Sequence, residues 1–157
     1  MINIKNIILN YLCKLMNYFN LYIWNDINFM YNDILKKAFG LINKSRSMSD
    51  LFEKEKKITS KYVHATSKGH EIIQIATALH LKTNDFLYPY YRDDSMLLGI
   101  GLQPYDLILQ LLAKSKDPFS GGKTYYSHPS LNDSNFPKIP HQSSATGMQA
   151  IPATGAA

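Results

Sequence analysis

The stretch from Phe86 to Asp94 carries the side chains best suited to bind a small anionic ligand. Its sequence is Phe-Leu-Tyr-Pro-Tyr-Tyr-Arg-Asp-Asp. Arginine offers a planar fork that can hold a phosphate or a carboxylate with two hydrogen bonds, and tyrosine adds an apolar ring with a polar tip. The residues alone also allow a plainer interpretation, in which the stretch is an aromatic turn packed on the core and Arg92 pairs with Asp93 or Asp94.

Composition limits the kind of protein that can position these side chains. The chain has 157 residues, enough for one domain with a sizeable core, and a formal net charge of +5. Its Lys and Arg residues are scattered over amphipathic segments, so a nucleic-acid interface is not favoured. The single cysteine, Cys13, excludes an internal disulfide and a cysteine-based zinc site. We therefore expect a cytoplasmic protein in a reducing compartment.

Residues 1–27 are predicted to form an amphipathic leader whose role the sequence does not define. The segment is rich in Ile, Leu, Tyr and Phe, but Asn and Lys interrupt it throughout. It has no apolar run near the roughly 20 residues that a membrane-spanning helix needs, and no small-residue cleavage site follows a compact apolar core. Membrane insertion and secretion are therefore not expected, although the leader could lie on a membrane surface. We assign residues 28–157 to one domain.

Helical periodicity predicts the elements that precede the Tyr-Arg stretch. Residues 28–57 have apolar side chains three or four apart, and Gly40 leaves open whether they form one helix or two. A loop is expected at 58–68, followed by a helix over 69–81 with Ser67 as its N-cap. The predicted buried stripe of this second helix is Ile72, Ile75, Ala76 and Leu79.

The segment from residue 86 to the end of the sequence is expected to contain further helices joined by a long loop. Residues 86–88 are expected to be extended, residues 95–98 to form a short helix, and a longer helix to begin near Pro104, since proline is favoured in a first helical turn. A long loop at 119–142 is typical of a functional or disordered segment. Residues 143–157 are small and mildly apolar, which predicts a buried helix.

Simple phosphate and metal motifs do not account for the chain. Gly122-Lys123-Thr124 looks like the end of a phosphate-binding loop, but Asp117 replaces the earlier glycine of that motif and no strand is predicted before it. No two histidines have the i, i+4 spacing of a helical metal pair, so no metal site is predicted. His64 and His128 lie in polar loops, where a histidine can contact substrate or simply be solvated.

Three segments together carry a resemblance. They are residues 67–71 (Ser-Lys-Gly-His-Glu), residues 88–93 (Tyr-Pro-Tyr-Tyr-Arg-Asp) and residues 120–149, which run from Ser-Gly-Gly-Lys through Ser-His to Gln-Ser-Ser-Ala-Thr-Gly-Met-Gln. In this order and spacing they resemble the alpha subunit of thiamine-diphosphate-dependent 2-oxo acid dehydrogenases, the decarboxylating component of the pyruvate and branched-chain complexes. The third segment looks more like the branched-chain type. The resemblance implies an α/β fold, of which this chain would be the mostly helical N-terminal part with few short parallel strands.

The resemblance implies roles for the matching cofactor-binding residues. Tyr91 and Arg92 match the pair that contacts the cofactor diphosphate, in agreement with the anion-binding chemistry of these side chains. Ser144 and Thr146 match positions beside the aminopyrimidine ring of the cofactor, partly through backbone groups.

Two histidines and a cation site are implied in the same way. His64 resembles a loop histidine that lines the substrate pocket, and His128 resembles one near the active-site entrance; these two are the candidate catalytic residues. Met148 stands where a potassium site of the branched-chain type uses a threonine hydroxyl, and a thioether is a poor potassium ligand, which argues against the site here. The other residues that match this site are Ser143, Ala145 and Gln149.

The resemblance also implies cofactors and partners. The complete enzyme decarboxylates a 2-oxo acid on thiamine diphosphate and acylates a lipoyl group, with a beta subunit and a lipoyl-bearing acyltransferase as partners. In the family, a Gly-Asp-Gly segment and paired asparagines further along hold the magnesium that bridges the diphosphate, and this sequence stops before them. We therefore expect the N-terminal portion of an alpha subunit, truncated at its C-terminus and inactive alone. The alternative is a non-catalytic, basic helical binding module, membrane-associated through residues 1–25.

Overall fold

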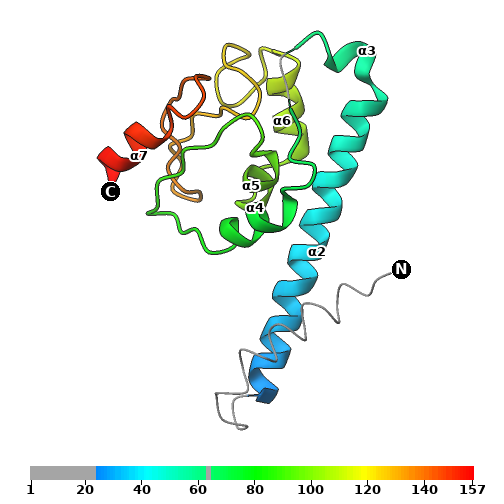
Figure 1. The fold of residues 1–157 in the computed structure, drawn as a ribbon, viewed down its shortest axis with the longest axis vertical. Coiled ribbons are helices and arrows are strands. Elements are labelled where there is room, and N and C mark those ends of the chain that lie inside the picture. The colour runs from blue at the N-terminus through cyan, green and yellow to red at the C-terminus, as the bar shows by residue number, and fades with distance from the viewer. Residues whose placement is uncertain (1–23, 63–64) are drawn as a thin grey trace. The chain divides into compact units, whose positions relative to one another are not determined.

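The computed structural model describes residues 24–62 and 65–157, with side-chain burial from residue 31 onward. The helices of this part of the chain are α2 (Trp24–Lys54), α3 (Lys56–Thr59), α4 (Glu71–Ala78), α5 (Asp94–Gly99), α6 (Pro104–Leu111) and α7 (Ala150–Ala156) (Figure 1). The chain divides into two compact units, Met1–Lys36 and Lys37–Ala157, and the site described below lies in the second. Most of the predicted leader falls outside the described residues.

Helix α2 runs without interruption through Gly40, so the alternative of two separate helices is wrong. Glycine in an exposed helix interior costs only about 1 kcal/mol relative to alanine. The helix offsets this cost by packing one face into the core, and the spacing of three or four residues along that face confirms the predicted helical period. The buried residues of the face are Ser45, Met48, Ser49 and Phe52.

Helices α4 and α5 pack directly on each other (Figure 1). Gly99 at the end of α5 comes so close to α4 that a methyl group added there would collide with the Cβ of Ala78. A side chain larger than hydrogen at position 99 would therefore push the two helices apart. This close approach holds α5, which follows the Tyr-Arg stretch, against α4.

The beginning of α4 differs from its prediction. The helix starts at Glu71 with His70 as its N-cap, and no side chain caps it, so the assignment of Ser67 as the N-cap is wrong. The Glu71 carboxylate reaches back instead, accepting the Gly69 N–H at 2.8 Å and pairing with Arg46 Nε at 3.4 Å. Glu71 is buried while Arg46 is about half exposed.

The buried face of α4 was also predicted only in part. Ile75 is buried as expected, but Ile72 is 58% exposed and Ala76 is exposed too. Two polar side chains, Glu71 and Gln74, occupy the buried face in their place. The helix therefore turns polar groups toward the site and leaves isoleucines on its surface.

A continuous apolar core lies under the site. Helices α5 and α6 contribute two leucines each, α2 contributes two residues, and the remainder come from the segment between α5 and α6 and the loops that follow α6. Each fully buried leucine of this cluster contributes about 1.5–3 kcal/mol by the area that it removes from water. The members are Met48, Phe52, Leu97, Leu98, Leu102, Leu107, Leu111, Tyr126 and Ile139.

No strand forms within residues 24–62 and 65–157, so the predicted short parallel strands are missing from the described chain, while its mostly helical character is confirmed. Isolated bridges take their place: Phe86 pairs in parallel with Lys138, and Leu131 pairs antiparallel with Ile139. The Leu87 N–H donates to the Lys138 carbonyl oxygen at 2.9 Å. These bridges hold the entry to the Tyr-Arg stretch against the long loop.

The C-terminal segment is not buried as its small residues predicted. Helix α7 has no buried residue, and Ile151 is 75% exposed. Alanine and glycine side chains give the helix little apolar area to remove from water, so packing supplies little energy to bury it. None of the helices in the described ranges has both the length and the hydropathy to span a membrane.

Candidate functional site

The Tyr-Arg residues lie in a tight turn immediately before α5. The Asp93 N–H donates to the Tyr90 carbonyl oxygen at 2.9 Å, and Asp93 Oδ2 accepts the Tyr90 N–H at 2.8 Å. Asp93 occupies the N-cap position of α5, but its side chain closes this turn and does not cap the helix. Burial raises the pKa of Asp93, while the hydrogen bond from the Tyr90 N–H and electrostatic interactions with the nearby His70 and His128 rings oppose that rise.

Asp94 anchors the start of α5 in the core. Its Oδ1 accepts the N–H groups of Ser67 at 2.8 Å and Ser95 at 3.1 Å, and its Oδ2 accepts the Tyr126 hydroxyl at 3.2 Å. Burial raises the pKa of Asp94, while these hydrogen bonds favour the charged form and limit the rise. The pKa of Tyr126 is also raised, first by burial and then by the Asp94 charge.

Three buried serines connect α2, α5 and the loop before α4. The Ser45 hydroxyl lies 3.2 Å from that of Ser67 and 2.5 Å from that of Ser95, and Ser67 and Ser95 are hydrogen-bonded to each other. A hydroxyl can donate one hydrogen bond and accept two, so the three can satisfy one another away from water. Ser67 therefore has a tertiary role and not a capping one.

Arg92 is exposed and presents its guanidinium to solvent. The Arg92 Cζ lies 5.3 Å from the centroid of the Tyr91 ring, and the Tyr91 and Tyr90 ring centroids lie 4.1 Å apart. In the described chain no ion pair joins Arg92 to a carboxylate. The interpretation in which Arg92 pairs with Asp93 or Asp94 is therefore wrong, and the stacked guanidinium can bind an external anion.

The Tyr90 hydroxyl connects this turn to the segment that follows Gln142. It donates to the Ser144 carbonyl oxygen at 2.8 Å and lies 2.9 Å from Thr146 Oγ1. Because a phenol has only one proton to give, the Thr146 hydroxyl is then the donor in the second contact. The structure thus brings Ser144 and Thr146 next to the turn that holds Tyr91 and Arg92, and both of these contacts are exposed.

The residues that match the potassium site also lie in this exposed segment. The Ala145 N–H donates to Ser143 Oγ at 3.1 Å, and Gln149 Nε2 donates to the Ser143 carbonyl oxygen at 2.9 Å. The Met148 side chain is 38% exposed. These hydrogen bonds lie within the segment itself. The expected absence of potassium binding by these residues stays a prediction.

His128 is buried, so its interpretation as a solvated loop residue is wrong. Its Nδ1 lies 2.8 Å from the Tyr126 carbonyl oxygen, which places the proton on Nδ1 and leaves Nε2 as an acceptor with no partner in the described chain. The ring packs edge-on against Tyr90 at 5.6 Å and Tyr125 at 6.3 Å between centroids. His128 therefore lies against the Tyr90 ring, whereas His64 lies outside the described residues.

Asp117 organises the Ser-Gly-Gly-Lys loop through hydrogen bonds within the chain. Asp117 Oδ2 accepts the Ser120 hydroxyl at 2.7 Å and the Gly122 N–H at 3.0 Å, and Ser120 Oγ in turn accepts the N–H groups of Lys123 and Thr124 at 3.0 Å. Gly122 has a φ of +82°, and a Cβ there would overlap the Ala113 carbonyl. These amides point at protein acceptors, which agrees with the rejection of a phosphate-binding loop.

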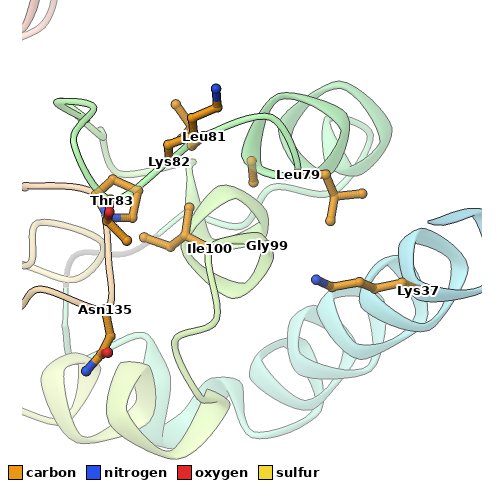
Figure 2. A pocket seen from close by; sticks show the side chains of 10 residues that line it. Lys37, Leu79, Leu81, Lys82, Thr83, Gly99, Ile100 and Asn135 are labelled. Atoms are coloured by element: carbon orange, nitrogen blue, oxygen red, sulfur yellow. The ribbon is translucent and has the colours of Figure 1, made fainter.

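Two surface cavities lie near the site but do not contain the turn. The larger, of about 400 Å³, is lined by Tyr62, Gln110 and Lys123 among others. The smaller, of about 200 Å³, lies between the ends of α4 and α5, with Lys37 of α2 and Asn135 on opposite sides of it (Figure 2). Neither of these two cavities is lined by Arg92 or Ser144.

The described residues contain no cluster of carboxylate, histidine or cysteine side chains that could bind magnesium. In the ranges 24–62 and 65–157 no group of three His, Cys, Asp or Glu side chains is placed to hold a metal ion. Magnesium needs a nearly octahedral set of oxygen ligands. The exposed Arg92 guanidinium has the chemistry to bind an anionic group, but no carboxylate cluster among the described residues could hold a magnesium ion beside it.

Two residues that build this site could not be singled out from the sequence. Tyr90 is one of several tyrosines in the Tyr-Arg stretch, although it makes the long-range contact with Ser144. Gln74 donates hydrogen bonds to the Arg92 carbonyl oxygen and to Asp93, but it falls outside the predicted buried stripe of its helix. The position of Tyr90 directly after Pro89, and of Gln74 one turn after Glu71, carries no pattern that distinguishes them. Only the tertiary contacts reveal them.

Comparison of the sequence with known families identifies the class of protein to which this helical scaffold and Tyr-Arg turn belong. The sequence model described as "Dehydrogenase E1 component" matches residues 41–157. The chain belongs to this family.

Particular relatives point to the alpha subunit. The chain is 37% identical over 62 residues to 2-oxoisovalerate dehydrogenase subunit alpha of Bacillus subtilis, a match that covers 39% of this chain and 19% of the relative. It is 31% identical over 78 residues to pyruvate dehydrogenase E1 component subunit alpha of Mycoplasma pneumoniae, covering 50% and 22%. The matches thus span about a fifth of the length of these relatives. No solved structure matches the chain. The predicted resemblance to part of an alpha subunit is confirmed.

Proposed function

We propose that this chain supplies one side of the thiamine diphosphate site in the alpha subunit of a 2-oxo acid dehydrogenase. The observation that carries the proposal is the contact of the Tyr90 hydroxyl with Ser144 and Thr146. It brings two exposed polar residues against the turn that carries Arg92, and Arg92 has no carboxylate partner in the described chain. A cofactor with a diphosphate at one end and a polar ring at the other suits such a surface.

Each end of the cofactor has residues whose chemistry fits it. The Arg92 guanidinium and the Tyr91 hydroxyl would bind the diphosphate, because a planar fork gives charge-assisted hydrogen bonds to phosphate oxygens. The Ser144 and Thr146 groups would contact the aminopyrimidine ring. Thiamine diphosphate, when bound, supplies the carbon nucleophile and electron sink that decarboxylation of a 2-oxo acid needs.

The two histidines have proposed roles at the substrate end. His128 offers a buried Nε2, unpartnered in the described chain, that can accept a proton or a hydrogen bond. Its Nδ1 contact with the Tyr126 carbonyl oxygen fixes the ring orientation and the tautomer. We assign His64 to the same pocket on the resemblance alone.

The complete enzyme would use more than these residues. We propose that it decarboxylates a branched-chain 2-oxo acid or pyruvate in the cytoplasm and acylates the lipoyl group of an acyltransferase. The beta subunit and further alpha-subunit residues would complete the site, including the magnesium ligands. Residues 28–157 would then form the N-terminal part of an α/β domain.

Cofactor binding by the assembled enzyme tests the proposal. The complete reading frame that contains these residues is coexpressed with the beta subunit from the same source and titrated with thiamine diphosphate and Mg²⁺ by isothermal titration calorimetry. Saturable binding that becomes much weaker in Arg92→Gln supports the proposal. Equal heats with and without the cofactor would exclude it.

The reaction is tested separately on the same preparation. Reductive acylation of a lipoylated acyltransferase domain is followed by mass spectrometry with 2-oxoisovalerate or pyruvate as substrate. Acylation with either oxo acid supports a dehydrogenase, and the preferred oxo acid decides between the two types. Cofactor binding without acylation by either one would contradict the proposed reaction.

A further inference from the structure

We propose that Gln74 of α4 is a positioning residue for the Tyr91-Arg92 pair, the proposed binding site for the cofactor diphosphate, which we call the anion grip. It fixes the backbone of the turn from which these two side chains extend. The inference rests on the proposed function, since the grip is argued to bind the cofactor. Gln74 does not hold the exposed guanidinium itself. It holds the backbone of the turn from which that guanidinium projects.

The Gln74 amide uses all of its polar groups at the turn. Its Nε2 donates to the Arg92 carbonyl oxygen at 2.9 Å and to Asp93 Oδ1 at 3.0 Å. Its Oε1 accepts the Met96 N–H at 3.3 Å. The side chain is only 7% exposed, so water does not readily replace these bonds. One amide therefore ties the turn and the first turn of α5 to α4.

The direction of the Arg92 side chain depends on this backbone. Within the described chain the guanidinium stacks on Tyr91 but has no ion pair. The backbone of the turn fixes the point from which this long side chain extends, and an exposed side chain loses conformational entropy when a ligand fixes it. Fixing the Arg92 carbonyl and the Asp93 carboxylate pre-organises the grip before the cofactor arrives.

Only an amide satisfies this position. A glutamate at position 74 would keep the acceptor for Met96 but place a second carboxylate against Asp93, which is already disfavoured in its charged form by burial. A methionine would keep the volume but leave Asp93 Oδ1 and the Arg92 carbonyl oxygen without this donor. The neutral donor pair of glutamine thus suits a partly buried acceptor pair.

The test compares cofactor affinity with fold stability in the assembled enzyme. Gln74→Met and Gln74→Glu are each titrated with thiamine diphosphate and Mg²⁺ by calorimetry, and their melting temperatures are measured without cofactor. We expect the dissociation constant to rise about tenfold in Gln74→Met and further in Gln74→Glu. The control is Thr59→Val, which removes a buried hydrogen bond to the Phe52 carbonyl oxygen, 2.8 Å long, away from the turn.

A reciprocal exchange separates positioning from simple loss of stability. When Gln74→Glu is combined with Asp93→Asn, the amide introduced at position 93 can donate to the carboxylate introduced at position 74, and its oxygen can still accept the Tyr90 N–H. We expect this double variant to recover part of the affinity that Gln74→Glu loses. Thr59→Val should lower the melting temperature and leave the dissociation constant unchanged.

The outcomes distinguish this inference from the proposed function. If the unaltered enzyme binds no thiamine diphosphate, the proposed function is wrong. If it binds the cofactor and the Gln74 variants bind it equally well, Gln74 is only structural and the inference is overturned. Loss of affinity in proportion to melting temperature, with Thr59→Val on the same line, also overturns it.

Discussion

The hydroxyl of Tyr90 donates to the carbonyl oxygen of Ser144 at 2.8 Å, across 54 positions of sequence. The contact joins the turn that carries Tyr91 and Arg92 to the exposed segment before α7 that carries Ser144 and Thr146. Because it lies at the surface, it adds little to the free energy of unfolding. We propose that it holds the two proposed cofactor-binding segments at a fixed separation.

Removing this hydroxyl should therefore affect binding more than folding. In the assembled enzyme, Tyr90→Phe is expected to raise the dissociation constant for thiamine diphosphate about fivefold, since one lost hydrogen bond corresponds to about 1 kcal/mol. Calorimetry gives the affinity, and urea denaturation gives the stability. Tyr105→Phe, which alters another tyrosine that is 64% exposed, is the matched control and should change neither. An unchanged affinity in Tyr90→Phe would remove the Ser144 contact from the site.

The affinity for the cofactor should depend on the shape of the Arg92 side chain as well as on its charge. Lysine keeps the charge but loses the planar fork, so Arg92→Lys is expected to weaken cofactor binding about tenfold and Arg92→Gln about a hundredfold. The loss in Arg92→Gln should shrink at high salt, where exposed charges are screened. Lys36→Gln, a change to a surface cation that is 79% exposed, serves as the control and should have no effect. Equal affinities of Arg92→Lys and the unaltered enzyme would contradict bidentate binding.

The elements that were predicted well are those with a long periodic pattern. Helix α2 could be predicted because apolar side chains recur three or four positions apart along residues 29–42. The predicted stripe is not the buried face, however: Ile34 is exposed, and the buried side chains lie further along, from Ser45 to Phe52. Helix α4 has only about two turns, and isoleucine occurs on several sides of it. Its apolar pattern therefore does not define a face, and the contacts of Gln74 with Arg92 and Met96 decide which side is buried.

The residues of the site also divide into those that residue type alone predicts and those that only tertiary contacts reveal. Arginine beside tyrosine indicates anion binding from residue types alone, so Arg92 could be proposed from the sequence. The burial of His128 could not, because its neighbours in sequence are polar while its neighbours in space are Tyr90 and Tyr125. The anchoring of Asp94 by Ser67 and Tyr126 is likewise set by segments distant in sequence.

The close approach of α4 and α5 predicts a rescue between two substitutions. Gly99→Ala should destabilise the fold by about 1–3 kcal/mol, because the new methyl collides with the Cβ of Ala78. Adding Ala78→Gly removes the obstructing methyl and should restore most of the loss, although glycine in α4 costs about 1 kcal/mol by itself. Urea denaturation of the two single variants and the double variant measures the coupling. Additive effects would show that the helices do not meet at these positions.

Burial of Asp94 makes a prediction about the pH dependence of stability. Its pKa in the folded state is raised above the usual value of 3.8. Between 3.8 and that raised pKa the folded state binds more protons than the unfolded state. The contribution of Asp94 to stability therefore increases as pH falls through this window, and it is lost as pH rises through the folded pKa.

Asp94→Asn removes this titration while keeping an oxygen that can accept the N–H groups of Ser67 and Ser95. The unaltered protein should gain stability relative to Asp94→Asn as the pH is lowered from about 7 toward about 4, measured by urea midpoints at each pH. The pKa of Asp93 is raised in the same direction, but its contribution is present in both proteins and cancels in the difference. Asp106→Asn is the control for removing one carboxylate without touching the anchor. A stability difference that is flat with pH would mean that Asp94 titrates alike in the folded and unfolded states, and that its burial is balanced by the three hydrogen bonds that it accepts.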